Sequence, residues 1–148
     1  IFDRYNKCYD SHNSFMATMR SDLSYMPDQK LNDGNFIKNY FLYVTPSNST
    51  AVAQKMKEAK ELFTKKGTKQ HFLVLHSGFG ATEEFYVVMI AAKNEADYQK
   101  ISDEDDVVLG QELYYEWVNK WNDLYPLLNR TNTVTGRLLE DLSYTAKK

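Results

Sequence analysis

Residues 36–49, Phe-Ile-Lys-Asn-Tyr-Phe-Leu-Tyr-Val-Thr-Pro-Ser-Asn-Ser, open the part of the chain that decides the fold. Tyr40 to Val44 is a continuous run of strand-forming residues, and Pro46 stops it. One of the polar residues at 47–49 can cap the helix that follows, because their side-chain oxygens accept hydrogen bonds from free amides in a first helical turn. The stretch therefore predicts a strand that leads directly into a helix.

Residues 52–92 continue this pattern. Apolar residues recur at helical spacing from 52 to 63, with lysines and glutamates on the opposite face, and Gly67 after two lysines is typical of a helix end. Two strands are predicted after it, at His71–His76 and Phe85–Ala92. Both are almost continuously apolar, which indicates that both of their faces are buried.

The C-terminal third predicts a helical region and one more strand. A short helix is expected at 95–101 and a longer one at 104–125, which Pro126 should end or kink. A last strand is expected at 132–142, with Gly136 as a possible bulge. The acidic run at 103–106 is expected to stand before the long helix and to complement its positive N-terminal dipole.

Strand, helix, two strands, helix and strand is the ferredoxin-like order, which predicts an α+β fold with an antiparallel sheet. On Tyr40–Ser49, His71–Phe79 and Tyr86–Ile90, the chain resembles the dimeric α+β barrel superfamily, which includes antibiotic-biosynthesis monooxygenase-type and NIPSNAP-like proteins. The resemblance spans 36–145 and implies that two such sheets pack into a barrel. The second sheet would cover the second apolar face of the strands.

A short internal echo accompanies this order. Asp22-Leu23-Ser24-Tyr25 recurs as Asp141-Leu142-Ser143-Tyr144, 119 residues later. About a hundred residues is also the size of one ferredoxin-like unit, so we interpret residues 1–35 as an N-terminal segment that closes a preceding repeat, and 36–148 as the barrel domain. The two sheets of the barrel would then come from a homodimer or from tandem repeats of one longer chain.

The candidate pocket follows from strand alternation. His71 and His76 are five residues apart and face opposite ways, so they cannot bind one metal ion without a bulge; we predict no metal site and no cofactor. With the aliphatic face of their strand packed on the helices, His76 points into the barrel. Phe41 and Tyr43 are expected to face the barrel too. The predicted ligand pocket is Tyr43, Phe72, His76 and Tyr86; the alternative is a filled aromatic core.

The helix predicted at 104–125 carries two apolar stripes, and such a helix usually packs on its own sheet and on a second body. Tyr114, Trp117 and Trp121 form the aromatic part of its surface. We predict these three residues as an interface.

Composition excludes some classes of partner. The formal net charge is −2, without the basic footprint that nucleic acid requires, and no apolar run approaches the length of a membrane span. Cys8 is the one cysteine, so no internal disulfide can form; this suits a reducing compartment and leaves export, for example to a periplasm, open.

No nucleophile, acid or base set converges in the sequence. The first reading is a structural or small-ligand-binding α+β barrel protein, its ligand small and apolar or aromatic. A second reading is a monooxygenase-like enzyme that acts on a small aromatic substrate beside His76. A third is a module for protein interaction and assembly.

Overall fold

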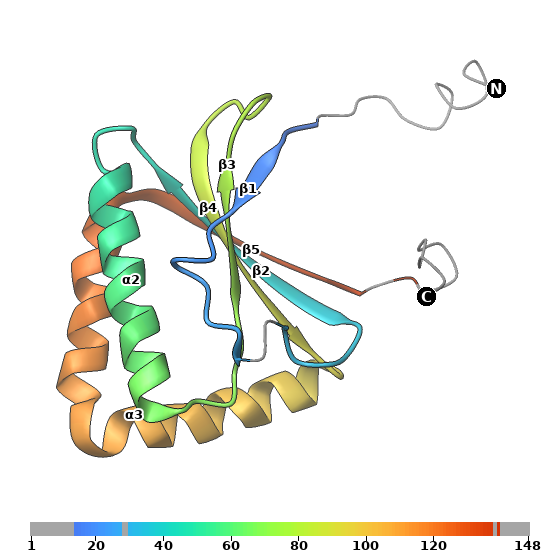
Figure 1. Cartoon of the computed structure of the whole chain (residues 1–148), viewed down its shortest axis with the longest axis vertical. Helices are drawn as coiled ribbons and strands as arrows, with labels where there is room; N and C mark the ends of the chain where they lie inside the picture. The colour runs from blue at the N-terminus through green and yellow to red at the C-terminus, as the bar shows by residue number, and fades with distance from the viewer. Residues whose placement is uncertain (1–13, 28–29, 138, 140–148) are drawn as a thin grey trace.

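The computed structural model describes residues 14–27, 30–137 and 139, with the backbone alone at 111–118, 120 and 121. Figure 1 shows the elements in chain order: β1 (Ala17–Met19), β2 (Phe36–Val44), α2 (Ser49–Lys66), β3 (Leu73–Ser77), β4 (Glu84–Ala92), α3 (Glu95–Leu124), the 3-10 turn η2 (Tyr125–Leu127) and β5 (Leu128–Arg137). The strands form one sheet in the order β1-β3-β4-β2-β5. Every pairing in this sheet is antiparallel.

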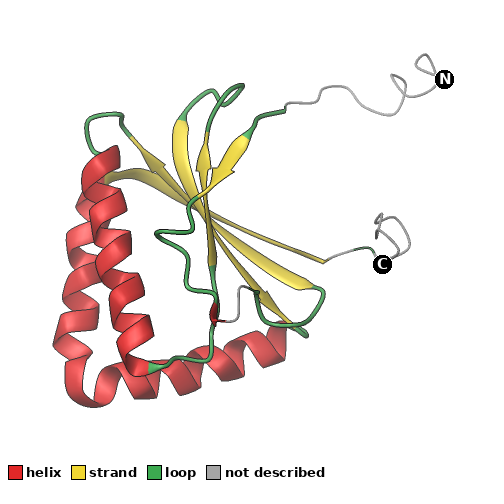
Figure 2. Cartoon of the chain, in the orientation of Figure 1, coloured by secondary structure: helices red, strands yellow, loops and turns green. Residues whose placement is uncertain are grey.

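From β2 to β5 the chain is a ferredoxin-like β-α-β-β-α-β unit, which confirms the predicted fold class. Both helices lie on the same side of the sheet, as Figure 2 shows. Helix α2 ends as its sequence predicts: Gly67 has φ of 64°, and its amide donates to the carbonyl of Phe63.

Strand alternation decides which side chains the helices cover. On β2 the even-numbered residues Leu42 and Val44 are buried in the core with Val52 and Met56 of α2. Leu42 stands opposite Tyr86 of β4, so Tyr86 belongs to the same face. The odd-numbered residues of β2 point away from the helices, toward a face that neither α2 nor α3 covers (Figure 1).

The N-terminal segment contributes the fifth strand of the sheet, β1. Strand β1 pairs with the outer edge of β3, and Tyr25 forms an isolated bridge with Phe72. Between them the chain turns, and Leu23 enters the core with 1% of its surface exposed. Residues 17–25 therefore complete the hydrophobic core of the ferredoxin-like unit.

Helix α3 differs from the prediction. A single helix replaces the two that we expected, and the acidic run at 103–106 lies inside it rather than before it. Asp105 explains why: its two carboxylate oxygens accept the backbone amides of Lys69 and Gln70, at 2.8 and 2.7 Å. The carboxylate is thus used to fix the segment before β3, not to complement a helix dipole. Figure 1 shows that α3 changes direction along its length.

Three smaller expectations were also wrong. Strand β5 begins at Leu128, earlier than expected, because the 3-10 turn that contains Pro126 leads straight into it. The break in register lies between Tyr43 and Val44 and not at Gly136. Asn48 stands at the N-cap of α2 without a side-chain capping bond; its amide nitrogen donates to the carbonyl of Leu127 instead, at 3.1 Å.

Candidate functional site

The four residues of the predicted pocket divide between the two faces of the sheet. His76 stands opposite Tyr86, and Phe72 is buried in the same helix-covered core. Tyr43 stands opposite Phe85 and points the other way. The expectation that Tyr43 shares a face with the other three is wrong, because the face of β3 that packs on the helices carries Phe72 and His76, not the leucines.

His76 takes part in a polar network at the start of α2. Its ring stacks on Tyr86 with 4.4 Å between centroids, and its Nε2 lies 2.9 Å from Oε1 of Glu84. The hydroxyl of Tyr86 lies 3.0 Å from that of Ser49. Hydrogen bonding by Ser49, and then by His76, lowers the pKa of Glu84. The histidine is therefore held by structural partners.

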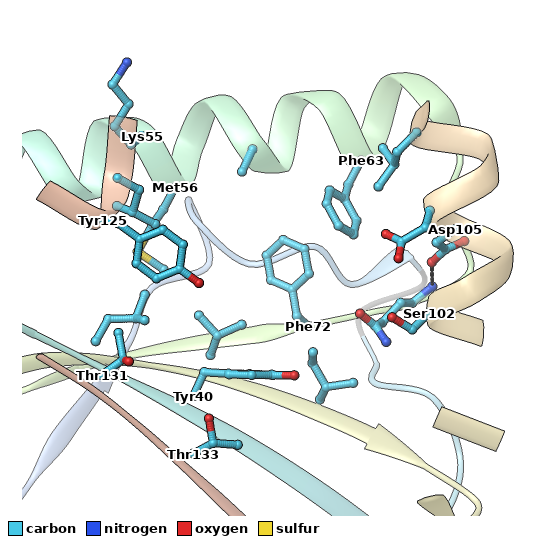
Figure 3. A pocket seen from close by; sticks show the side chains of 18 of the residues that line it. Tyr40, Lys55, Met56, Phe63, Phe72, Ser102, Asp105, Tyr125, Thr131 and Thr133 are labelled. Carbon is cyan, nitrogen blue, oxygen red and sulfur yellow. Dashed lines mark hydrogen bonds between the residues drawn. The ribbon is translucent and has the colours of Figure 1, made fainter. Parts of the chain in front are cut away.

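A cavity of about 340 Å³ lies between the sheet and the two helices (Figure 3). This volume falls at the lower end of small-molecule sites, roughly 300–1,000 Å³. Its apolar walls come from β2, α2, β4 and α3 and from Phe72: Leu42, Met56, Ala59, Phe63, Phe72, Val88, Ile90, Leu109 and Leu124. Phe63 and Phe72 meet edge to face there, with 5.2 Å between ring centroids.

Two tyrosines line the cavity, Tyr40 from β2 and Tyr98 from the first part of α3. The hydroxyl groups of Tyr40 and Tyr98 lie 2.6 Å apart, and Nζ of Lys38 lies 4.3 Å from the centroid of the Tyr98 ring. Burial, together with the bond to Tyr40, raises the pKa of Tyr98 to about 12. Tyr98 therefore stays protonated at neutral pH, and a phenol hydroxyl can both donate and accept hydrogen bonds.

Carboxylates border another part of the cavity. Asp105 is buried, and its oxygens are occupied by the two backbone amides. Its neighbour Asp106 also lines the cavity, although its side chain is exposed; partial desolvation and the charges of Asp103 and Asp105 raise its pKa. A cationic or hydrogen-bond-donating group near Asp106 would relieve this repulsion.

A positively charged side chain, that of Lys55, also lines the cavity. Nζ of Lys55, on α2, lies 3.4 Å from Oε2 of Glu58 and 3.3 Å from Oδ2 of Asp123 on α3. These bonds link the two helices beside the cavity, and the hydrogen bond to Asp123 is the first cause of the raised pKa of Lys55. Figure 3 shows Lys55, Tyr125 and Tyr40 around the space.

The uncovered face of the sheet is aromatic. Phe85 lies within 5.6 Å of Phe41 and 5.3 Å of Tyr43, measured between ring centroids, and Phe15 meets it edge to face at 5.1 Å. The guanidinium of Arg130 lies 3.4 Å from the centroid of Tyr43 and is paired with Glu83. Met19 and Val134 extend this surface with 49% and 44% exposure. We call these residues the bare sheet face.

The sequence reasoning missed the cavity residues Tyr40, Tyr98 and Asp106. Tyr40 had a usable signal, since it alternates with Phe41 and belongs to the face opposite to it. The predicted interface residues Tyr114, Trp117 and Trp121 lie within α3, but their side chains are outside the described residues, so that interface stays a prediction.

Two features are absent from the described residues. No group of three or more histidine, cysteine, aspartate or glutamate side chains is placed to hold a metal ion in that part of the chain. None of the helices described there combines the length and the apolarity that crossing a membrane requires.

A solved structure resembles this fold. It is a dimeric ferredoxin-like protein from an uncultured marine organism, with a TM-score of 0.53 and 11% sequence identity over 76% of this chain and 95% of that one. No protein-family model matches the chain, and no curated protein matches it in sequence. At this identity the likeness concerns the fold.

Proposed function

We propose that this chain is a small-molecule-binding protein and that the cavity between the helices and the sheet holds the ligand. The observation that carries the proposal is the composition of that cavity, in which apolar walls surround a few polar groups. Tyr40 and Tyr98 offer hydroxyl groups, and Asp106 offers a carboxylate that lacks a neutralising partner among the contacts of the described residues. The ligand is a small, mainly apolar or aromatic molecule with a donor group.

Tyramine and 4-ethylphenol test this proposal as a matched pair, because they share a phenol ring and differ by the amine. We expect saturable binding of both in isothermal titration calorimetry, with tyramine the tighter because its ammonium group neutralises Asp106. Bound ligand should raise the thermal midpoint in proportion to its concentration over Kd. Absence of saturable binding for both compounds would contradict the proposal.

Filling the cavity provides the matched control. Ala59 lines the cavity from α2, and Ala51 is exposed on the same helix. Ala59→Phe should abolish binding because the new ring occupies the ligand's space, and Ala51→Phe should leave it unchanged. Equal binding by both variants would place the ligand elsewhere.

We infer a second property, homodimerisation through the bare sheet face. Its support is the aromatic cluster of Phe41, Tyr43 and Phe85, which lies on the side of the sheet away from α2 and α3, together with the dimeric state named for the structurally similar protein. Large apolar patches on a monomer usually mark an interface. In a two-fold dimer this face would meet its own copy, giving the barrel that the sequence resemblance implies.

Phe41→Glu tests the dimer, since it places a charge in the middle of the bare sheet face. Phe79→Glu is the control, because Phe79 is 87% exposed at the β3–β4 turn. In sedimentation equilibrium we expect the wild type and Phe79→Glu to have the mass of two chains, and Phe41→Glu that of one. A wild-type protein that stays monomeric at high concentration would rule this dimer out.

A further inference from the structure

The hydrogen bond between Tyr40 and Tyr98 uses only one of the two hydroxyl protons in the pair. The two oxygens lie 2.6 Å apart, so one hydroxyl group donates and the other accepts. The proton of the accepting hydroxyl group has no acceptor among the described residues. Both side chains line the cavity, so this spare proton belongs to the wall of the proposed ligand site.

The neighbours of Tyr40 on the helix-covered face explain why the proton stays unmatched. Lys38 and Leu42 flank it along β2, Val88 stands opposite it on β4, and Thr133 stands opposite it on β5. The side chains of Leu42 and Val88 have no polar atoms, and a lysine ammonium group donates without accepting. Of the four, Thr133 alone could accept, but Figure 3 shows the Tyr40 hydroxyl group directed away from it. These neighbours therefore supply no acceptor.

The surroundings of Tyr98 lead to the same result. This side chain is 7% exposed, and its ring lies 5.9 Å from that of Phe36, measured between centroids. Nζ of Lys38 lies 4.3 Å from the centroid of the Tyr98 ring and 5.3 Å from that of the Tyr40 ring. The positive charge of Lys38 attracts electron-rich groups and repels cations. This part of the wall therefore favours an electron-rich oxygen atom of a ligand over a donor group.

We propose that the ligand presents a carbonyl oxygen to the hydroxyl pair of Tyr40 and Tyr98. A carbonyl oxygen accepts hydrogen bonds and carries no proton, so it takes the spare proton without adding another donor. An apolar ligand of the same shape would cut this proton off from water and leave it unbonded, which weakens binding. The inference rests on the proposed ligand-binding function, and it adds an acceptor to the donor group expected near Asp106.

Acetophenone and α-methylstyrene test the carbonyl contact as a matched pair, because a C=O group in the first stands where the second has C=CH₂. The second compound is the more apolar, so the affinities of the wild type alone do not isolate the hydrogen bond. The measured quantity is therefore the ratio of the two affinities, determined by isothermal titration calorimetry of the full chain and compared between variants.

The double variant Tyr40→Phe/Tyr98→Phe removes both hydroxyl groups and keeps both rings. We expect the ratio of acetophenone to α-methylstyrene affinity to fall about fivefold to tenfold, the effect of one net hydrogen bond. The affinity for α-methylstyrene should hold or rise, which shows that the cavity is intact. A ratio that stays at the wild-type value would overturn the proposal.

The single variants test whether one spare proton is the source of the effect. Either hydroxyl group alone can donate to a ligand, so at least one of Tyr40→Phe and Tyr98→Phe should keep the wild-type ratio. Loss of the ratio in both single variants would contradict this source.

Tyr25→Phe is the matched control. It also removes a phenol hydroxyl group, one that donates to the carbonyl of Thr68 at 3.2 Å, and Tyr25 does not belong to the cavity lining. It should leave the ratio of affinities unchanged. A fall as large as that of the double variant would mean a general loosening of the fold and would overturn the proposal.

The carbonyl carbon of bound acetophenone reports the hydrogen bond directly. When it is labelled with ¹³C, its resonance moves downfield as the oxygen accepts a hydrogen bond. We expect the bound resonance to lie further downfield in the wild type than in the double variant. Identical positions in the two proteins would show that the hydroxyl pair does not reach the carbonyl oxygen.

These measurements separate the carbonyl contact from ligand binding itself. Ala59→Phe should abolish the binding of acetophenone and α-methylstyrene, which places both in the cavity; persistent binding would overturn the proposal. Saturable binding of 4-ethylphenol together with an unchanged ratio would leave the ligand-binding function standing and remove the carbonyl contact. Absence of binding by 4-ethylphenol, tyramine and both new probes would remove the function and the contact together.

Discussion

Tyr40 and Tyr98 are joined through their hydroxyl groups, 2.6 Å apart, although 58 residues separate them in the chain. The bond ties strand β2 to the first part of α3 at the wall of the cavity. It also brings the two phenol groups into a partly buried site, in which Tyr98 is 7% exposed. The stability of this contact is therefore open to direct measurement.

Tyr98→Phe should lower the free energy of unfolding by about 1 kcal/mol, the usual net value of such a bond. Tyr40→Phe should cost a similar amount. The double variant should cost less than the sum of the two, because each single change already breaks the shared bond. Urea unfolding followed by circular dichroism checks this. Strict additivity of the two losses would show that the hydroxyl groups do not interact.

The same pair predicts a loss of stability at high pH. Because the pKa of Tyr98 is raised from 10.0 to about 12 in the folded chain, the unfolded state releases this proton first. Its contribution is complete below pH 10 and is lost as the pH rises through 10 to about 12. Tyr98→Phe should flatten this part of the stability profile. If Tyr98→Phe keeps the wild-type dependence of stability on pH in this range, other groups must cause that dependence.

Asp105→Asn should destabilise the fold by about 1–3 kcal/mol, because the amide nitrogen of the new side chain cannot accept a backbone amide. Asp105 is 4% exposed and serves the amides of both Lys69 and Gln70. Asp103→Asn is the control, since Asp103 belongs to the same acidic run but is exposed. The urea midpoint should fall for the first and barely move for the second. Similar shifts in both variants would show that the loss of stability comes from the change in net charge and not from the lost hydrogen bonds.

Local residue patterns predict the fold of this chain better than its site. The apolar run Tyr40–Val44 and the helical period after residue 52 are local, and they predicted β2 and α2 correctly. Which face of β3 meets the helices is not local: it depends on the register that places His76 opposite Tyr86 and Leu42 opposite the same tyrosine. Alternation within one strand cannot supply that register, so Tyr43 was grouped with residues of the other face.

The cavity could not be predicted from the sequence, for a related reason. It exists because α3 is one continuous helix that changes direction and because Asp105 fastens the loop before β3 to it. We read the acidic run as the start of a new helix, since a carboxylate at a helix N-terminus is the commoner arrangement. The structure differs because Asp105 binds the backbone amides of Lys69 and Gln70, which precede it in the chain by 36 and 35 positions.

Gly34→Ala should be far more destabilising than Gly67→Ala, although both glycines have positive φ. At Gly34, with φ of 143°, an added Cβ would lie 2.0 Å from the carbonyl oxygen of Ala92, so the loop before β2 would have to move away from the end of β4. At Gly67 nothing lies within 4 Å, and the cost is the left-handed backbone alone, about 1 kcal/mol. Thermal denaturation of both variants checks this order. Equal midpoints would mean that the loop at Gly34 yields without loss of contacts.

Leu23→Ala should lower the free energy of unfolding by about 2–5 kcal/mol, because it opens a cavity in the core of the sheet domain. Leu23 precedes the β2–β5 unit in sequence, yet it is 1% exposed and packs in the same core cluster as Phe72 and Val74. Met19→Ala is the matched control, since this nearby side chain is 49% exposed. Urea unfolding should shift strongly for Leu23→Ala and little for Met19→Ala. A small effect of Leu23→Ala would mean that the domain from β2 to β5 is stable without its N-terminal segment, so that closing the β3 edge contributes little to the fold.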